Sequence, residues 1–389
     1  MTHPTQPGPV PAPDRTAHTN IEKGRLCSFV TVPAGEVRIL QLTDVQIIDS
    51  SQMRRPDRLC EFERRKWEPE RIWDNALSYI EEAVANARPH LIVLTGDNVY
   101  GEFDDSGRQL RAFAQYIDSF GIPWAPVFGN HDNESEIGPE RQCDILEAQP
   151  HCLFTRGDAT GYGNYTVTLL QSPAIGIDPV PGTDRTTETS QASENAPADF
   201  DPVPLRTLLM LDTHGCLTHP GIRDDQVELC RRAEREIVGK CGKLPPLFAF
   251  YHIPSTEFLL AAHNAGYQDS EDYFARYELG VTLPASNGDF GKRDDPQGRV
   301  GATEAFMEYF TAAGGDGIFV GHYHKNCTSI FSGGIRYTFG LKTGVYDYHN
   351  DDMLGSTLIT LGGSGADKAG QFTVRHLYTR LRDNFHLTT

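Results

Sequence analysis

The chain has 389 residues, which is enough for one large domain or two ordinary ones and for a substantial core. Its 35 basic and 53 acidic residues give a formal net charge of −18, and the sequence contains no cluster of basic residues. We therefore expect no nucleic-acid partner, because binding to a phosphate backbone needs clustered positive charge. If the substrate is an anion, the positive charge that attracts it should come from bound metal.

Residues 1–22 are polar and rich in proline, and no later stretch approaches the roughly 18 apolar residues of a membrane span. We expect a cytoplasmic protein without a membrane partner, in which a disordered lead over residues 1–30 precedes a single domain over residues 31–385. The eight cysteines are scattered and include no CxxC pair, so they indicate neither a zinc ribbon nor a redox motif. The sequence leaves the oligomeric state open.

Apolar stretches and amphipathic helices alternate in the first third of the chain. The expected elements are strand 36–43, helix 69–87, strand 89–94, helix 106–120 and strand 124–128. This β-α-β-α-β order implies a parallel sheet with right-handed crossovers, in which ligands bind at the carboxyl ends of the strands.

The remainder of the chain is less regular. Aromatic and β-branched residues over 162–170 predict an antiparallel strand, and the polar composition of 172–204 predicts a flexible insertion. The long and mostly irregular stretch 253–299 is a candidate lid. Short strands with glycine turns over 328–381 should add a second sheet. Between these segments we expect strand 205–211, helix 224–240, strand 247–251, helix 302–313 and strand 317–320.

Polar side chains of metal-ligand type directly follow five of the predicted strands. They are Asp44 with Gln46, Asp97 with Tyr100, Asn130 with His131 and Asp132, His252, and His322 with His324. Carboxylate, imidazole and amide oxygen together suit Mn, Fe or Zn ions, and the absence of clustered thiolates argues against a soft site. A central carboxylate can bridge two ions that share a hydroxide.

In order and spacing, from about residue 36 to residue 345, these motifs resemble the calcineurin-like metallophosphoesterase superfamily, whose signature is DxH, GDxx, GNHD or GNHE, a lone His, and GHxH. The segment 251–254, with Glu257 nearby, looks like the lone-His segment of the cytosolic purple-acid-phosphatase-like branch. The resemblance implies an α/β (α+β) fold, a four-layer αββα sandwich of two mixed sheets flanked by helices. It also implies two metal ions, drawn from Fe, Mn or Zn.

The resemblance assigns a role to each matching position. Metal 1 would be held by Asp44 and His324, metal 2 by Asn130, His252 and His322, and Asp97 would bridge them. His131, held by Asp132, would face the phosphate. Glu257 would either contact substrate or be a solvated acid at a helix start.

The sequence departs from the signature at Gln46, where most members have His. Gln46 itself would ligate metal 1 through its amide oxygen if the chain resembles the ADP-ribose and CDP-alcohol diphosphatases with their DxQ motif. Alternatively, Tyr100 would ligate it, as in the GDxxY motif of purple acid phosphatases. We favour Gln46, because it lies two residues from Asp44, and we expect Tyr100 to be a packing residue that closes over the site.

The implied activity is hydrolysis of a phosphate monoester, diester or pyrophosphate, with in-line attack by a hydroxide that bridges the two ions. His131 would stabilise the phosphate or protonate the leaving group. The substrate would be a phosphorylated small molecule or a phosphoprotein, and a nucleoside-diphosphate-linked pyrophosphohydrolase is the alternative that the DxQ motif suggests. A further alternative is a catalytically silent scaffold that binds protein partners, although only one motif position departs from the signature.

Overall fold

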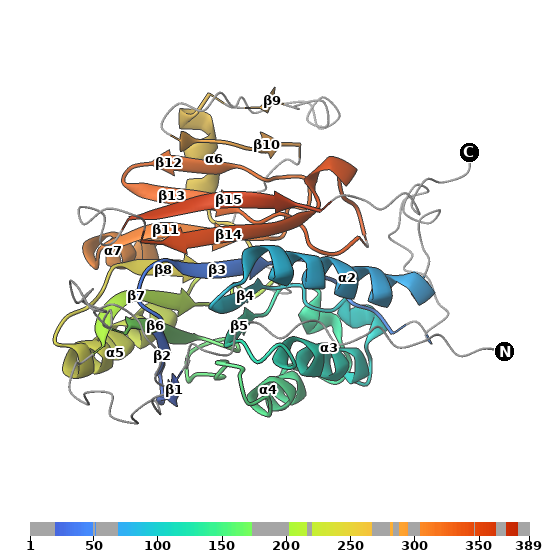
Figure 1. Cartoon of the computed structure of the whole chain (residues 1–389), viewed down its shortest axis with the longest axis horizontal. Helices are drawn as coiled ribbons and strands as arrows, with labels where there is room; N and C mark the ends of the chain where they lie inside the picture. Colours follow the sequence, from blue (N-terminus) through green and yellow to red (C-terminus); the bar gives the residue numbers. More distant parts are fainter. Residues whose placement is uncertain are drawn as a thin grey trace, which may run out of the picture.

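The computed structural model describes residues 20–49, 51, 69–172, 202–215, 220–266, 281–282, 288–294, 304–345, 347–362 and 371–379. Within these ranges, two mixed β-sheets form the centre of the molecule (Figure 1). Helix α2 packs against the first sheet, and helices α5 and α7 pack against the second. The predicted α/β sandwich of two mixed sheets flanked by helices is confirmed.

The first sheet has five strands in the order β15-β14-β3-β4-β5. Its central strands run parallel and are connected through helices, as the alternating sequence pattern predicts. These elements are β3 (Val37–Leu42), α2 (Pro69–Ala87), β4 (Leu91–Thr95), α3 (Arg108–Asp118) and β5 (Trp124–Val127). The carboxyl ends of three buried strands therefore lie at one edge of this sheet.

The C-terminal strands divide between the two sheets, so the expectation that 328–381 builds only a second sheet is wrong in part. Strands β14 (Gly355–Leu361) and β15 (Phe372–Tyr378) join the first sheet, where Leu358 lies opposite Leu40 of β3. Both of these leucines are buried, and this burial favours the pairing with β3. Figure 1 shows β14 and β15 lying together above β3.

The second sheet has eight strands in the order β1-β2-β6-β7-β8-β11-β13-β12. Strand β6 pairs parallel with β2 and antiparallel with β7. The strands are β1 (Asn20–Lys23), β2 (Cys27–Val32), β6 (Tyr165–Gln171), β7 (Val203–Met210), β8 (Leu247–Phe250), β11 (Gly315–Val320), β12 (Ser329–Ser332) and β13 (Ile335–Phe339).

Strands β1 and β2 correct the predicted disordered lead over residues 1–30, because residues 20–23 and 27–30 are β-strand. The side chains of Cys27, Phe29 and Val30 are buried. This burial explains why the segment is ordered despite its polar surroundings in the sequence. Residues 1–19 lie outside the described part of the chain.

The stretch 253–299, expected to be mostly irregular, contains a helix and a short hairpin. Most of its other residues lie outside the described ranges, as does most of the predicted insertion 172–204, so the proposed lid stays a prediction. Among the described helices, none combines the length and the apolar character needed to cross a membrane. The remaining elements are α4 (Pro139–Glu147), α5 (Asp224–Cys241), α6 (Thr256–Asn264), α7 (Glu304–Ala312), β9 (Val281–Thr282), β10 (Lys292–Arg293), and the 3₁₀ turns η1 (Gly101–Phe103), η2 (Asp132–Glu134) and η5 (Asp351–Met353).

The two sheets share one apolar core. Ile39 of the first sheet belongs to the same buried cluster as Phe250 and Phe319 of the second, and the rings of these two phenylalanines stack with centroids 4.9 Å apart. Each side chain of this size contributes about 1.5–3 kcal/mol when it is fully buried. This shared core fixes the position of one sheet relative to the other.

An ion pair in the second sheet whose arginine is buried and whose aspartate is 33% exposed gives a stability prediction. Arg206 is fully buried, and its guanidinium lies 2.6 Å from Asp316 and 4.2 Å from the ring centroid of Phe248. Replacing Asp316 by Ala should lower the free energy of unfolding by about 3 kcal/mol, because the buried cation loses its carboxylate partner. Urea denaturation measures this loss.

The matched control is Glu36→Ala, which removes the exposed partner of Arg38 at 3.4 Å. It should cost less than about 1 kcal/mol, as exposed ion pairs do. Equal losses for the two variants would contradict the argument from burial.

Candidate metal centre

Ligand-type side chains from both sheets meet at one edge of the fold. Those from the first sheet follow β3, β4 and β5, and those from the second sheet follow β8 and β11. Contacts of 2.9 to 3.3 Å link these side chains to one another. The six residues are Asp44, Asp97, Asn130, His252, His322 and His324. The sequence prediction that these positions lie together therefore agrees with the structure.

The backbone at this edge is strained. The dihedral φ is 52° at Asp44, 52° at Gln46, 51° at Asp97 and 75° at His322. Such left-handed values cost of order 1–3 kcal/mol for a residue with a side chain, and they persist only where surrounding contacts enforce them. Backbone hydrogen bonds hold these loops, among them Gln46 N to Asp97 O at 2.9 Å. Strain at four positions of one edge indicates loops shaped for a ligand.

The first half of the centre is formed by Asp44, Asp97 and His324. Their ligand atoms all lie within 4.8 Å of one another, and all three residues are buried. His324 Nε2 lies 3.2 Å from Asp44 Oδ1, while its Nδ1 lies 2.8 Å from the carbonyl oxygen of Tyr348. The carbonyl fixes the ring so that Nε2 points to the carboxylates, which is how proteins orient metal-binding histidines.

The second half is formed around Asn130. Its Oδ1 lies 3.1 Å from His252 Nε2 and 2.9 Å from His322 Nδ1. His252 Nδ1 lies 2.8 Å from the carbonyl oxygen of Thr95, so Nε2 faces the centre. His252 Nε2 is also 3.3 Å from Asp97 Oδ2.

Asp97 lies between the two halves and shows that this donor set fits metal. Its Oδ2 is buried and accepts no hydrogen bond from the described residues, although it is within ion-pair distance of His252. A buried carboxylate oxygen without a hydrogen-bond donor is costly unless an ion takes it up. The combination of carboxylate, imidazole and amide oxygens suits Mn, Fe or Zn. The donor set of the centre therefore fits bound metal.

Charges in the centre shift the pKa values of its residues in opposite directions. Burial would raise the pKa of Asp97, but His252 and His131 outweigh it and lower that pKa. Burial would lower the pKa of His252, but Asp97 raises it to about 9. Burial and the neighbouring His252 lower the pKa of His322 to about 3. Because metal ligands must be deprotonated, an ion that binds His252 has to displace a proton that Asp97 stabilises.

The ring of His131 lies beside Asp97, and its side chain is 12% exposed. Glu134 Oε2 is 2.8 Å from His131 Nδ1 and fixes the ring. His131 Nε2 then faces Asp97 Oδ2 at 3.9 Å and Asp347 Oδ2 at 4.0 Å. Burial would lower the pKa of His131, but Asp97 and Glu134 raise it above its ordinary value. The imidazole can therefore offer a hydrogen-bond donor to an anion at this place.

Asp132 has a different role from the predicted one. Its carboxylate accepts hydrogen bonds from the backbone N–H groups of Gly129 at 2.7 Å and Val99 at 3.0 Å, and from Asn98 Nδ2 at 3.2 Å. The prediction that Asp132 holds the ring of His131 is wrong, because the 3₁₀ turn η2 brings the side chain three residues after His131 to the ring instead. Asp132 connects the turn after β5 to the loop after β4.

Gln46 lies in the centre, but its amide oxygen has another partner. Lys342, which is 1% exposed, donates from Nζ to Gln46 Oε1 and, at 2.9 Å, to the backbone oxygen of Asp44. Gln46 Nε2 donates to Asp347 Oδ2 at 3.3 Å. The oxygen that would have to ligate metal 1 is therefore already hydrogen-bonded.

The other tentative residues have these surroundings. Tyr100 is buried, and its ring stacks on that of His131 with centroids 4.4 Å apart, which agrees with a packing residue beside the site. Its role as a ligand stays a prediction, as does substrate contact by Glu257 in the first turn of α6. His214 and His349, which carried no motif, are both buried histidines with hydrogen-bond partners, Gln226 Oε1 at 3.1 Å and the Asp347 carbonyl at 2.9 Å.

Sequence reasoning missed Glu134, Lys342 and Asp347. The spacing of Glu134, three residues after His131, is a local signal that could have found it. Lys342 and Asp347 reach Gln46 from nearly three hundred positions away in the chain, and no local pattern marks them. Asp347 has φ of 66°, a further strained residue at this edge.

Gly129 gives a prediction about the close approach of two loops. A Cβ atom at this position would lie 2.2 Å from Asp97 Oδ1 and 2.4 Å from its backbone nitrogen. Gly129→Ala should therefore displace the central carboxylate, weaken metal binding and cost about 1–3 kcal/mol of stability. Chemical denaturation and metal analysis of the same preparation measure both effects.

The control is Gly239→Ala on the exposed side of α5, where no atom other than the neighbouring residues and the helix's own backbone lies within 4 Å of the added methyl group. It should stabilise the helix by up to about 1 kcal/mol, because alanine is the better helix former. Unchanged metal binding and stability in the Gly129 variant would show that Asp97 tolerates the shift.

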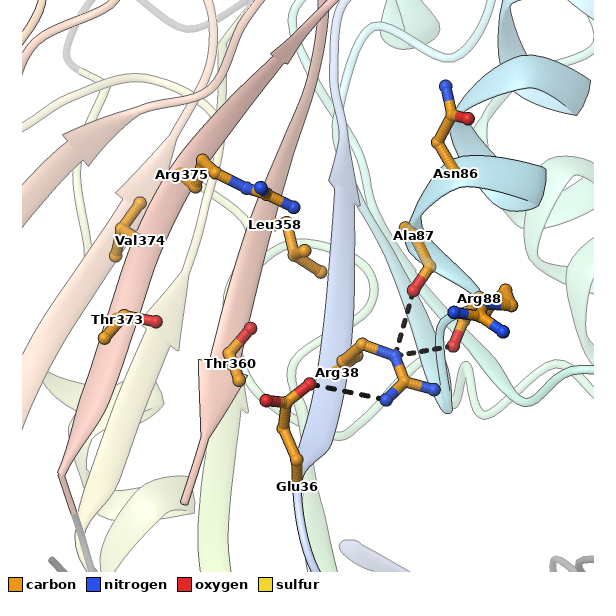
Figure 2. A pocket seen from close by; sticks show the side chains of 10 residues that line it. All are labelled: Glu36, Arg38, Asn86, Ala87, Arg88, Leu358, Thr360, Thr373, Val374 and Arg375. Carbon is orange, nitrogen blue, oxygen red and sulfur yellow. Dashed lines mark hydrogen bonds and ion pairs between the residues drawn. The ribbon is translucent and has the colours of Figure 1, made fainter. Parts of the chain in front are cut away.

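A cavity of about 620 Å³ lies at the opposite end of the strands (Figure 2). Its lining includes Arg38 at the start of β3, Arg88 just before β4, and Arg375 on β15. Arg38 Nε donates to the carbonyl oxygens of Ala87 and Arg88, both at 2.9 Å. Because the centre follows the carboxyl ends of β3 and β4, this cavity takes no part in it.

Comparisons with known proteins identify the family. The calcineurin-like phosphoesterase family model matches residues 37–326. Phosphatase DCR2 of Saccharomyces cerevisiae is 25% identical over 269 residues, covering 65% of this chain and 40% of the yeast protein. A probable inactive purple acid phosphatase 14 of Arabidopsis thaliana is 37% identical over 105 residues, covering 24% of this chain and 26% of the plant protein. The chain thus spans less than half the length of these two relatives.

Among solved structures, purple acid phosphatase PPD1 from yellow lupin seeds aligns with a TM-score of 0.40 and 12% identity, covering 86% of this chain and 51% of that one. A dimetal phosphatase from Danio rerio aligns with a TM-score of 0.39 and 10% identity, covering 87% and 98%. The family model covers well over half of the chain and includes all five of the motifs that converge at the centre. The chain therefore belongs to the calcineurin-like phosphoesterase family.

Proposed function

We propose that the protein is a metal-dependent phosphoric ester hydrolase with a dinuclear centre. The observation that carries this proposal is the buried Oδ2 of Asp97, which accepts no hydrogen bond from the described residues and lies between two groups of ligand-type side chains. Metal 1 would be held by Asp44, Asp97 and His324, and metal 2 by Asp97, Asn130, His252 and His322.

The bound ions would supply positive charge to the phosphate and lower the pKa of water. The chain's own residues would do the rest. His131 directs Nε2 toward Asp97 at 3.9 Å, beside the metal positions, and would donate a hydrogen bond to a phosphate oxygen or a proton to the leaving oxygen. Glu134, 2.8 Å from the opposite ring nitrogen, would hold the imidazole in the required orientation.

The substrate would be a phosphorylated small molecule or a phosphoprotein. A net charge of −18 makes a polyanionic nucleic acid a poor partner for the surface as a whole. The hydrogen bond from Lys342 to Gln46 Oε1 makes the pyrophosphohydrolase alternative less favoured, because that alternative depends on a free amide oxygen.

The test is a substrate panel with the metal content measured on the same preparation. The panel contains an aryl phosphate, a bis-aryl phosphate, a phosphopeptide and a nucleoside-diphosphate-linked compound, each with Mn, Fe, Zn and Mg. We expect hydrolysis of a monoester or diester with about two ions per chain while free metal is present in the buffer. Strong preference for the diphosphate would favour the DxQ alternative, and bound metal without hydrolysis of any compound would favour a silent scaffold.

A further inference from the structure

The two metal positions differ in a way that the family signature does not describe. We propose that Gln46 is withheld from metal 1 by Lys342 and Asp347, so that metal 1 is the weak and exchangeable ion and metal 2 the tight one. This inference rests on the proposed dinuclear centre. It assigns Lys342 a role in setting the metal affinity of the site.

Both ends of the Gln46 amide are fixed. The oxygen accepts from Lys342 Nζ, and the nitrogen donates to Asp347 Oδ2 at 3.3 Å. Only the oxygen of an amide can bind a metal, since the NH₂ group is a donor. Turning the amide over would place its oxygen beside a carboxylate and its NH₂ group beside an ammonium. Both contacts would be repulsive, so the observed orientation is the stable one.

Lys342 itself cannot easily move away. Its side chain is 1% exposed, and its Nζ also donates to the backbone oxygen of Asp44 at 2.9 Å. The neighbouring Thr343 is tied to the same loop, because its backbone nitrogen donates to Thr43 O at 2.9 Å. A buried ammonium needs such partners to offset its desolvation, so leaving them would be costly.

The position of this ammonium matters for metal 1 in particular. It donates to the backbone oxygen of Asp44, which is a ligand proposed for metal 1 alone. Its positive charge offsets part of the negative charge of Asp44, Asp97 and Asp347. Positive charge fixed beside a cation site repels the cation. Metal 1 is thus left with three protein ligands and an adverse charge, whereas metal 2 has four ligands.

The test measures metal binding directly. The chelator-stripped protein is titrated with Mn²⁺ in a calorimeter, and the metal retained after dialysis is measured by mass spectrometry. We expect two classes of site whose affinities differ by about tenfold or more, with about one ion per chain retained. His324→Ala should abolish the weak class, and His322→Ala should impair the tight class.

Two further variants examine the mechanism. Gln46→Ala should leave the affinity of the weak class within about threefold, because Gln46 is not a ligand, whereas loss of a true ligand costs tenfold or more. Lys342→Met, which keeps the length of the side chain, should strengthen the weak class by about tenfold, since it removes the charge and frees the amide oxygen. Lys292→Met, at a lysine that pairs with Asp294 at 2.6 Å outside the centre, is the matched control and should change neither class.

Two ions of equal affinity, or loss of one ion in Gln46→Ala, would overturn this inference and leave the proposed function intact. Failure of the wild-type protein to bind any ion would overturn both. If Lys342→Met does not fold, the Gln46→Ala titration still decides the matter.

Discussion

Asp97→Asn is expected to abolish both metal retention and hydrolysis. The substitution keeps the size of the side chain and its tolerance of a left-handed backbone, but it removes the charge that both ions would share. The charge stabilisation supplied by metal is worth several kcal/mol, so the rate should fall by about a thousandfold or more. Metal analysis and kcat on the same preparation measure the two losses.

A control for this variant is Asp118→Asn, in α3 and outside the centre. Asp118 is also largely buried and lies 3.0 Å from His151 Nδ1, so the two variants perturb similar carboxylate pairs. The control should retain metal and activity. An Asp97→Asn protein with full metal content and full turnover would refute the assignment of this residue.

His131→Ala is expected to lower kcat by about 100- to 10,000-fold, the range for loss of a group that donates a proton or a hydrogen bond in the transition state. Metal content should stay unchanged, because the ring lies beside the ligands and not among them. This split between rate and metal occupancy separates His131 from every ligand in the centre. Steady-state kinetics and metal analysis together give the answer.

The matched control is His151→Ala. His151 also has a carboxylate partner, Asp118. It lies in the loop that follows α4, outside the metal centre. Its loss should leave kcat within about twofold, as expected for a residue without contact to the reacting groups. Loss of metal in His131→Ala, or an equal loss of rate in the two variants, would show that His131 acts by supporting the structure.

The sequence could predict the first sheet because its signals are local. Strands, helices and the polar residues after each strand alternate without interruption up to Asp132. Because the crossovers between parallel strands are right-handed, only one arrangement of these strands and helices is expected. The C-terminal strands could not be placed in this way. Whether β14 pairs with β3 depends on contacts such as that of Leu358 with Leu40, which a short apolar run does not specify.

The convergence of these side chains at one edge could be predicted for the same reason, while the partners that orient them could not. Asp97 and Asn130 stand in motifs whose order is recognisable. The hydrogen-bond partners of Gln46, Lys342 and Asp347, lie about three hundred positions away in a segment that carries no motif. The error at Asp132 has a different origin. The short turn η2 places Glu134 beside the ring of His131, and the sequence alone does not show which of two acidic residues so close together will lie there.

The division of the ligands between the two sheets has a consequence for folding. Asp44, Asp97 and Asn130 follow strands of one sheet, whereas His252, His322 and His324 follow strands of the other, so a bound ion would link the two sheets. By mass action, a ligand present at a hundred times its Kd stabilises the native state by about 2.7 kcal/mol. The concentration of free metal would then determine the stability of the folded protein as well as its rate of hydrolysis.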